Sequence, residues 1–288
     1  MKGHGIHIKR LPEMKRGVLI AGFDGWGNAL DVSNGMVSYL IRKLKARYFA
    51  DFNCDLFYRF DETRPFAMIA QGALKKVSPP AAAFHVEPNP SSENTLVILK
   101  ANEPHLQWYR FVDELCSFCE TLRIEKIITL GSMYDGVLHS DRLISGIASD
   151  EDLLSILKQR NVIPIDYQGP SAIHSLIQLQ GQKRGFQCIS LWCHCPYYLQ
   201  GITHFGMLSH LAHLLSYVGD FKIDTAELDQ RWKELNLQIQ HLIEKNTELR
   251  TLINELRKAK VRGSWASMKE SERKSEKIIQ LKDFLEPK

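Results

Sequence analysis

The sequence of 288 residues has no uninterrupted apolar segment long enough to span a membrane. Residues 1–16 also lack the apolar core that a secretory signal peptide requires. The six cysteines therefore occur in a chain without an export signal, which is typical of reduced thiols. We expect a cytoplasmic protein that does not contact a membrane.

The sequence also lacks common motifs for phosphate binding and acyl transfer. It has no G-x-x-x-x-G-K-[ST] loop, and G-x-G-x-x-G is incomplete, because Leu30 stands where the third glycine after Gly25 and Gly27 would fall. No G-x-S-x-G nucleophile elbow surrounds Ser132. From these absences we predict no catalytic residue and no cofactor.

Acidic residues are scarce at both ends. Residues 2–16 contain five Lys or Arg and one acidic residue, and residues 257–288 contain ten and five. The ends therefore carry a net charge of +9, whereas residues 17–256 carry −5. Such ends are usually solvated, so we do not expect nucleic acid as a partner. We predict one domain over residues 17–256, with basic or charged tails at 1–16 and 257–288.

Four short apolar runs predict the strands of one sheet, at residues 18–23, 95–99, 126–130 and 187–193. Continuous rather than alternating apolar character is typical of parallel strands that are covered on both faces. Helical patterns lie between them, so the order of elements predicts an α/β fold.

The remaining patterns predict further elements. They are a hairpin at residues 66–77, a helix at 103–122 entered through Pro104, a strand at 143–148 and a helix capped by Ser149.

The last third of the chain contains a heptad-like seam. Apolar residues follow one another at alternating steps of four and three from Leu228 to Leu256, with Asn246 at one core position. A single helix with this pattern could pack on its own domain or form an intermolecular coiled coil. The pattern alone leaves both open.

Two groups of cysteines have spacings that also occur in redox or metal sites. Cys116 and Cys119 form C-x-x-C in the middle of a predicted helix, where buried thiols are favoured over a redox pair. Cys193 and Cys195 lie two apart on a strand, so both thiols face one side of the sheet and His194 faces the other. No second ligand pair with the spacing of a zinc site follows. We predict no metal site.

Polar residues follow three of the predicted strands, and parallel strands end at one edge of a sheet. A shared pocket is therefore predicted at that edge, although helix capping or turn formation would also account for several of its residues. The predicted pocket residues are Asp24, Trp26, Gly27, Asn28, Glu103, His105, Gly131 and Ser132.

Five elements in a fixed order resemble the proteasome assembly chaperone 2 family. They are residues 18–52, 103–108, 128–131, 167–171 and 191–198, within a stretch of about 17–256. The resemblance, to a prokaryotic member, implies a three-layer α/β/α fold of the phosphorylase/hydrolase type, with a mainly parallel sheet and a long C-terminal helix. It also implies a homo-oligomer, most often a homotrimer, that binds protein partners.

The resemblance is incomplete at one functional motif. Family members that bind proteasomes carry a C-terminal hydrophobic–Tyr–x tail, whereas this chain has Pro287 in place of the tyrosine. We therefore do not expect docking to a proteasome through that tail. The sequence favours a non-catalytic assembly chaperone or interaction scaffold. The alternative is an enzyme or a small-molecule-binding protein that uses the pocket for a nucleoside or a carboxylate.

Overall fold

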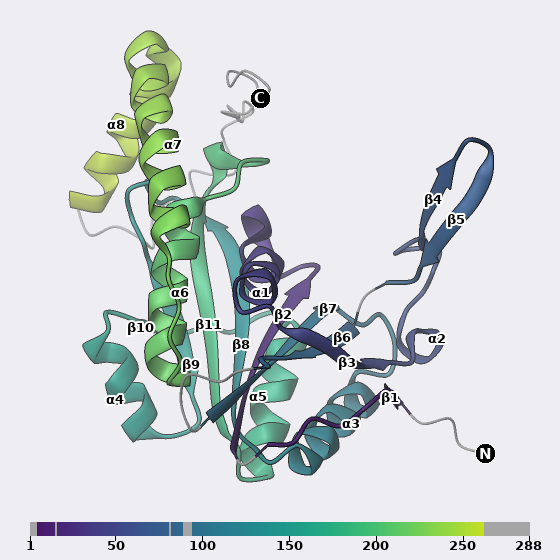
Figure 1. Ribbon diagram of the computed structural model, residues 1–288. Coiled ribbons are helices and arrows are strands. Elements are labelled where there is room, and N and C mark those ends of the chain that lie inside the picture. Colours follow the sequence, from purple (N-terminus) through teal and green to yellow (C-terminus); the bar gives the residue numbers. More distant parts are fainter. Residues whose placement is uncertain (1–4, 15, 81, 89–93, 262–288) are drawn as a thin grey trace.

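The computed structural model describes residues 5–14, 16–80, 82–88 and 94–261. Its centre is a nine-stranded sheet with the order β1-β3-β6-β7-β2-β8-β11-β9-β10 (Figure 1). The strands are β1 (Ile6–Ile8), β2 (Arg16–Asp24), β3 (Arg47–Phe52), β6 (Ala82–Val86), β7 (Asn94–Asn102), β8 (Ile124–Asp135), β9 (Ile144–Ala148), β10 (Ile163–Pro164) and β11 (Gln187–Pro196).

The four central strands, β7, β2, β8 and β11, are parallel neighbours. They contain the four predicted apolar runs, so the prediction of one mainly parallel sheet is confirmed. Antiparallel strands complete both sides: β6, β3 and β1 beyond β7, and β9 beyond β11. Because β1 pairs with β3, part of the predicted N-terminal tail belongs to the sheet.

Helices cover both faces of this sheet, which confirms the three-layer α/β/α fold (Figure 1). Successive residues of a strand point to opposite faces, so Ile20 packs in one core and Leu19 in the other. The first core contains residues of α1 (Val32–Lys43), α4 (Glu151–Gln159), α6 (Phe205–Gly219), α7 (Ala226–Lys245) and α8 (Thr247–Val261). The second contains residues of α2 (Cys54–Phe57), α3 (Trp108–Thr121) and α5 (Ile173–Lys183).

The predicted start of α3 is wrong. Pro104 suits the first turn of a helix, but the helix begins at Trp108, after Gln107 in a left-handed conformation with φ 53°. The Gln107 side chain donates a hydrogen bond to the carbonyl of Leu56, 2.9 Å away. Residues 103–107 therefore form a loop after β7.

Two boundaries near β8 and α4 also differ from the prediction. Strand β8 does not end before Gly131 but continues to Asp135, because it pairs with β11 over its whole second half. The cap of α4 is Asp150, whose carboxylate accepts a hydrogen bond from the Leu153 amide at 2.9 Å. Ser149 instead accepts a hydrogen bond from the Cys188 amide, which ties the loop to β11.

The prediction of one continuous helix along the heptad seam is also wrong. The chain leaves α7 at Asn246, which has an extended backbone, and Asn246 Oδ1 accepts a hydrogen bond from the Leu249 amide as the first turn of α8 forms. The seam therefore belongs to two helices that fold back on each other (Figure 1). Its residues Trp232, Ile239 and Ile253 are buried in the first core, so this segment packs on its own domain.

The predicted hairpin is present as β4 (Phe66–Ala70) and β5 (Ala73–Ser78), a separate two-stranded sheet that projects from the body (Figure 1). We call these residues the arm. Every residue of β4 is exposed, and among them Phe66 and Ile69 are each 67% exposed. The arm is therefore the part of the described chain in which apolar side chains gather without cover from the core.

The thiols of the C-x-x-C pair lie in the second core, as the helical interpretation predicted. Cys116 and Cys119 are buried inside α3, and burial raises the pKa of the Cys116 thiol to about 11. Cys193 and Cys195 are buried on the other face of the sheet, among apolar side chains of the first core. Raised pKa values of this kind keep a thiol protonated and unreactive.

Residues 257–261 continue α8, whereas the rest of the predicted C-terminal tail, including Pro287, lies outside the described residues. Among the described residues, no helix has both the length and the apolar character that crossing a membrane requires.

Candidate functional site

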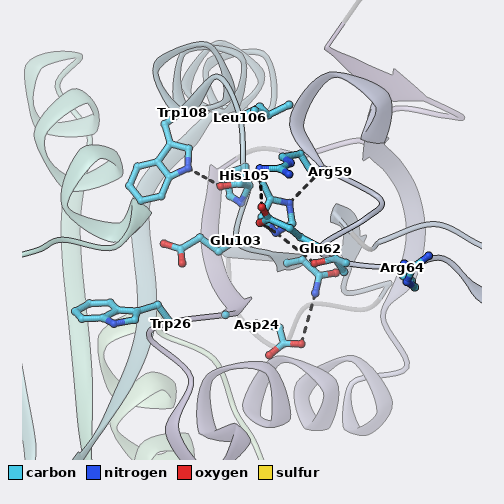
Figure 2. A pocket seen from close by; sticks show the side chains of 13 residues that line it. Asp24, Trp26, Arg59, Glu62, Arg64, Glu103, His105, Leu106 and Trp108 are labelled. Carbon is cyan, nitrogen blue, oxygen red and sulfur yellow. Dashed lines mark hydrogen bonds and ion pairs between the residues drawn. The ribbon is translucent and has the colours of Figure 1, made fainter.

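A cavity of about 710 Å³ opens where β2 and β7 end (Figure 2). Its lining also includes the segment that leads to the arm and the loop before α3. The lining residues are Asp24, Gly25, Trp26, Arg59, Glu62, Thr63, Arg64, Asn102, Glu103, Pro104, His105, Leu106 and Trp108.

Four of the eight predicted pocket residues lie in this lining: Asp24, Trp26, Glu103 and His105. Figure 2 shows Trp26 and Trp108 on one side of the cavity, with the Glu103 carboxylate between them. Trp26 is 64% exposed, so its indole is available to a molecule that approaches the rim. Gly27, Asn28, Gly131 and Ser132 do not line the cavity.

Asn28 fixes the turn at the end of β2 and the start of α1. Its side-chain amide donates to Asp24 Oδ1 at 3.0 Å, while its Oδ1 accepts from the amides of Ser33 and Asn34 at 3.0 and 3.3 Å. Asp24 is thus held by its own loop, which is the turn-forming role rather than a catalytic one.

Gly27, Gly131 and Ser132 form a packed layer beneath the loop. The Ser132 amide donates to the Gly27 carbonyl at 2.8 Å, and its hydroxyl donates to the Ala29 carbonyl at 2.8 Å. A Cβ on Gly131 would lie 2.7 Å from the Trp192 ring, so glycine is needed for this close approach. These residues hold the loop against the sheet and leave no free side chain for a ligand.

Glu103 links the cavity to α5. Its Oε1 accepts a hydrogen bond from the Ile173 amide at 2.8 Å, the first residue of that helix. Glu103 therefore interacts with the N-terminus of α5, although it precedes α3 in the sequence. A carboxylate at this position satisfies an unpaired amide and interacts favourably with the helix dipole.

Replacing Glu103 with alanine should lower the free energy of unfolding by about 1 kcal/mol, because the Ile173 amide loses its partner. Urea denaturation of the wild type and the variant measures this difference. Glu103→Gln retains an acceptor and should lose less. A Glu103→Ala variant as stable as the wild type would contradict the capping role.

His105 contacts the segment that leads to the arm and holds it in place through hydrogen bonds. Its Nδ1 accepts a hydrogen bond from the Arg59 amide at 3.2 Å, its Nε2 lies 3.3 Å from Thr63 Oγ1, and Glu62 is 3.6 Å away. Arg59 pairs with Asp61, and this hydrogen bond lowers the pKa of the Asp61 carboxyl. One wall of the cavity is therefore the root of the arm.

Sequence reasoning missed Arg59, Glu62 and Arg64, because they belong to an irregular segment more than 35 residues before Glu103. Trp108 belongs to the motif 103–108, but the predicted helix 103–122 puts it inside a helix and not at the rim of a pocket. Within the described ranges, no three His, Cys, Asp or Glu side chains group as a metal site would require.

The family model described as "PAC2 family" matches residues 19–243. The chain belongs to the PAC2 family. The match covers β2 to α7, and therefore includes the cavity, the arm and both layers of helices.

Solved structures of PAC2 proteins share this fold. A PAC2 family protein from Streptomyces avermitilis is 25% identical, with a TM-score of 0.74 over 82% of this chain and 99% of that one. A proteasome-assembly chaperone homologue from Mycobacterium tuberculosis is 22% identical, with a TM-score of 0.75 over 82% of this chain and 99% of that one.

An archaeal proteasome activator from Pyrococcus furiosus is 19% identical, with a TM-score of 0.63 over 82% of this chain and 97% of that one. Comparison with curated proteins gave no match. The PAC2 fold of this chain is thus shared with proteins described as chaperone homologues and as an activator.

Proposed function

We propose that this PAC2 protein is an assembly chaperone that forms a homotrimer and binds protein partners through the arm. The family supports a chaperone-like role. The observation that carries the proposal is the apolar face of the arm. The tail that proteasome-binding relatives use is not required for this mode of binding.

The register of β4 and β5 places two apolar side chains from each strand on one face, whereas the other face mixes Phe66 and Met68 with Lys76 and Ser78. Ala67 pairs with Val77 and Ile69 pairs with Leu74, and paired residues share a face. A bulge between Met68 and Ile69 shifts the register, so that Leu74 and Val77 come to the same side. We call Ala67, Ile69, Leu74 and Val77 the apolar face.

Exposure of the apolar face to water is unfavourable in free energy. Ile69, Leu74 and Val77 are 67%, 62% and 55% exposed. A two-stranded hairpin is at best marginally stable by itself, and contiguous exposed apolar surface marks sites of protein contact. A partner that covered this face would bury these side chains and stabilise the hairpin at the same time.

The cavity extends the same surface, because its wall is the root of the arm. Trp26 and the charged groups there suit the polar rim of a protein interface. The small-molecule alternative has less support, since Asp24, Glu103 and Arg59 already bond to groups of the protein itself.

We expect Ile69→Asp with Leu74→Asp to abolish self-association and partner binding, because two carboxylates would be buried without counter-ions in the interface. Light scattering at micromolar concentration should give about three times 33.0 kDa for the wild type and 33.0 kDa for the variant. Capture from an extract of the source cell should be lost in parallel.

Ala70→Asp with Ala73→Asp is the matched control. These residues also pair across the hairpin, and alternation puts Ala70 on the face opposite Ile69. The control adds the same charge and should preserve both the mass and the capture. An unchanged mass and unchanged capture in Ile69→Asp with Leu74→Asp would show that partners bind elsewhere.

A further inference from the structure

Three side chains from three neighbouring strands form a continuous hydrogen-bonded chain. The Ser145 hydroxyl of β9 lies 2.8 Å from His194 Nε2 of β11. His194 Nδ1 lies 2.7 Å from Asp135 Oδ2 of β8. None of the three lines the cavity described above, so this is a separate cluster.

The strand registers explain why these residues meet. Ser145 pairs with Trp192, two residues before His194, and Asp135 pairs with Pro196, two residues after it. Residues two apart on a strand share a face, so all three side chains lie on the same side of the sheet.

The cluster lies at the carboxyl edge of the parallel strands. Asp135 is the last residue of β8, and His194 is two residues before the end of β11. Strand β9 runs antiparallel to β11, so Ser145, its second residue, starts at this same edge. Open α/β sheets usually place their sites there.

The order of the contacts is that of an activated serine nucleophile. An imidazole whose Nδ1–H donates to a carboxylate presents its Nε2 lone pair to the hydroxyl, and it can then accept the hydroxyl proton. The tautomer follows from this network, because Asp135 has only acceptors when it is ionised.

The surroundings limit what can reach the serine. Ser145 is 5% exposed, whereas the side chains of His194 and Asp135 are 15% and 33% exposed. The cluster is thus open on the side of the histidine and the carboxylate. A narrow acyl group fits this access better than a bulky one.

We propose that Ser145, His194 and Asp135 form an acyl-transfer site that hydrolyses small esters. Ser145 is the nucleophile, His194 is the general base and then the general acid, and Asp135 is the positioning residue. This activity is additional to partner binding and does not depend on the arm.

The reaction takes place in two balanced steps. In the first, Ser145 Oγ forms a bond to the acyl carbon and the ester C–O bond breaks, while the hydroxyl proton passes through His194 Nε2 to the departing alcohol. In the second, water adds to the acyl carbon and gives a proton to His194, and that proton returns to Ser145 Oγ as the acyl bond breaks. The products are one alcohol and one carboxylic acid.

The test uses a small alkyl fluorophosphonate with the full-length protein. Attack by Ser145 forms an O–P bond, releases fluoride and leaves a stable adduct, which peptide mass spectrometry assigns to a residue. The wild type should be labelled at Ser145, and it should hydrolyse p-nitrophenyl acetate. Ser145→Ala should lose both, and His194→Gln should lower the rate of labelling at least about 100-fold.

Three variants separate chemistry from structure. Ser190→Ala removes a different buried serine, which lies on β11, and this variant should be labelled like the wild type. Asp135→Asn should slow labelling at least about 10-fold, because the imidazole loses the carboxylate that orients it, and Asp135→Glu, which keeps a carboxylate, should recover part of the rate. A purely structural contact would lower the melting temperature of the variants without lowering the labelling rate of the folded protein.

The proposal is overturned if the folded wild type incorporates no probe. It is equally overturned if Ser145→Ala, shown by its melting temperature to be folded, is labelled as fast as the wild type. Neither result would bear on the arm, whose test is the molecular mass.

Discussion

Lowering the pH from 7 to 4.5 should destabilise the folded protein by several kcal/mol, and buried histidines should account for much of the loss. His139, His174 and His204 are all buried. Burial lowers the pKa of each of them to about 4. An unfolded chain would protonate all three near pH 6.5.

The direction of this change in stability follows from the number of protons that the folded and unfolded states bind. At pH 8, well above the pKa of the unfolded histidines, the three are neutral in both states and contribute no pH dependence. Between pH 6.5 and about 4 the unfolded chain binds more protons, so stability falls with the pH by up to about 1.4 kcal/mol per unit for each histidine. The loss approaches its full value as the pH falls through about 4.

His204 offers a direct test. Its Nδ1 accepts the Met207 amide at 3.1 Å as the cap of α6, and its ring stacks on Trp232 with centroids 4.8 Å apart. His204→Asn retains a good cap but cannot be protonated. We expect the free energy of unfolding, measured by urea denaturation between pH 8 and 4.5, to depend less on pH in His204→Asn than in the wild type. The difference in slope should correspond to about one proton.

Stability at pH 8 measures the packing lost in this variant separately, because the ring of His204 is neutral there in both the folded and the unfolded state. A variant with the same slope as the wild type would mean that His204 is already protonated in the folded protein.

The fold could be predicted well wherever a local pattern decides the structure. Strands such as β2 and β7 are continuously apolar because helices cover both faces, and this leaves a clear signal in the sequence. Helix α1 begins at Val32, in the segment between the first two predicted strands where a helical pattern lies. The errors occurred where a distant contact overrides a local preference. Pro104 does not start a helix, because the loop before α3 is held by Leu56 and by α5.

The site could be predicted only in part, for the same reason. Asp24 and Glu103 follow adjacent parallel strands, so their meeting at one edge follows from topology. The acyl-transfer cluster has no local signature, because its three residues come from strands whose register alone brings them together. A motif search for a nucleophile elbow cannot find such an arrangement.

The heptad seam shows how one pattern can fit two structures. Steps of four and three predict a helix face that is buried, and the buried positions Leu228, Leu235 and Ile239 confirm it. They do not specify what covers that face. Asn246, which suits a register-setting core position, is in fact the residue at which the chain turns and α8 is capped.

Ile239→Asp should therefore destabilise the folded chain by at least about 4 kcal/mol. Ile239 is fully buried in the first core, so the change removes its packing and buries an unpaired carboxylate. Leu237→Asp is the matched control, because this neighbour on α7 is 66% exposed and should change stability by less than about 0.5 kcal/mol.

Urea denaturation at two protein concentrations distinguishes the two structures that the seam allows. The measurement uses the arm variant Ile69→Asp with Leu74→Asp as background, so that the proposed trimer does not contribute. If α7 packs on its own domain, the loss in Ile239→Asp is then the same at low and high concentration, because no chains separate on unfolding. An intermolecular coiled coil would instead make stability depend on concentration, and Ile239→Asp would produce a folded monomer. We expect the first result, because Ile239 and the residues that surround it, from α6, α7 and α8, belong to the core of one chain.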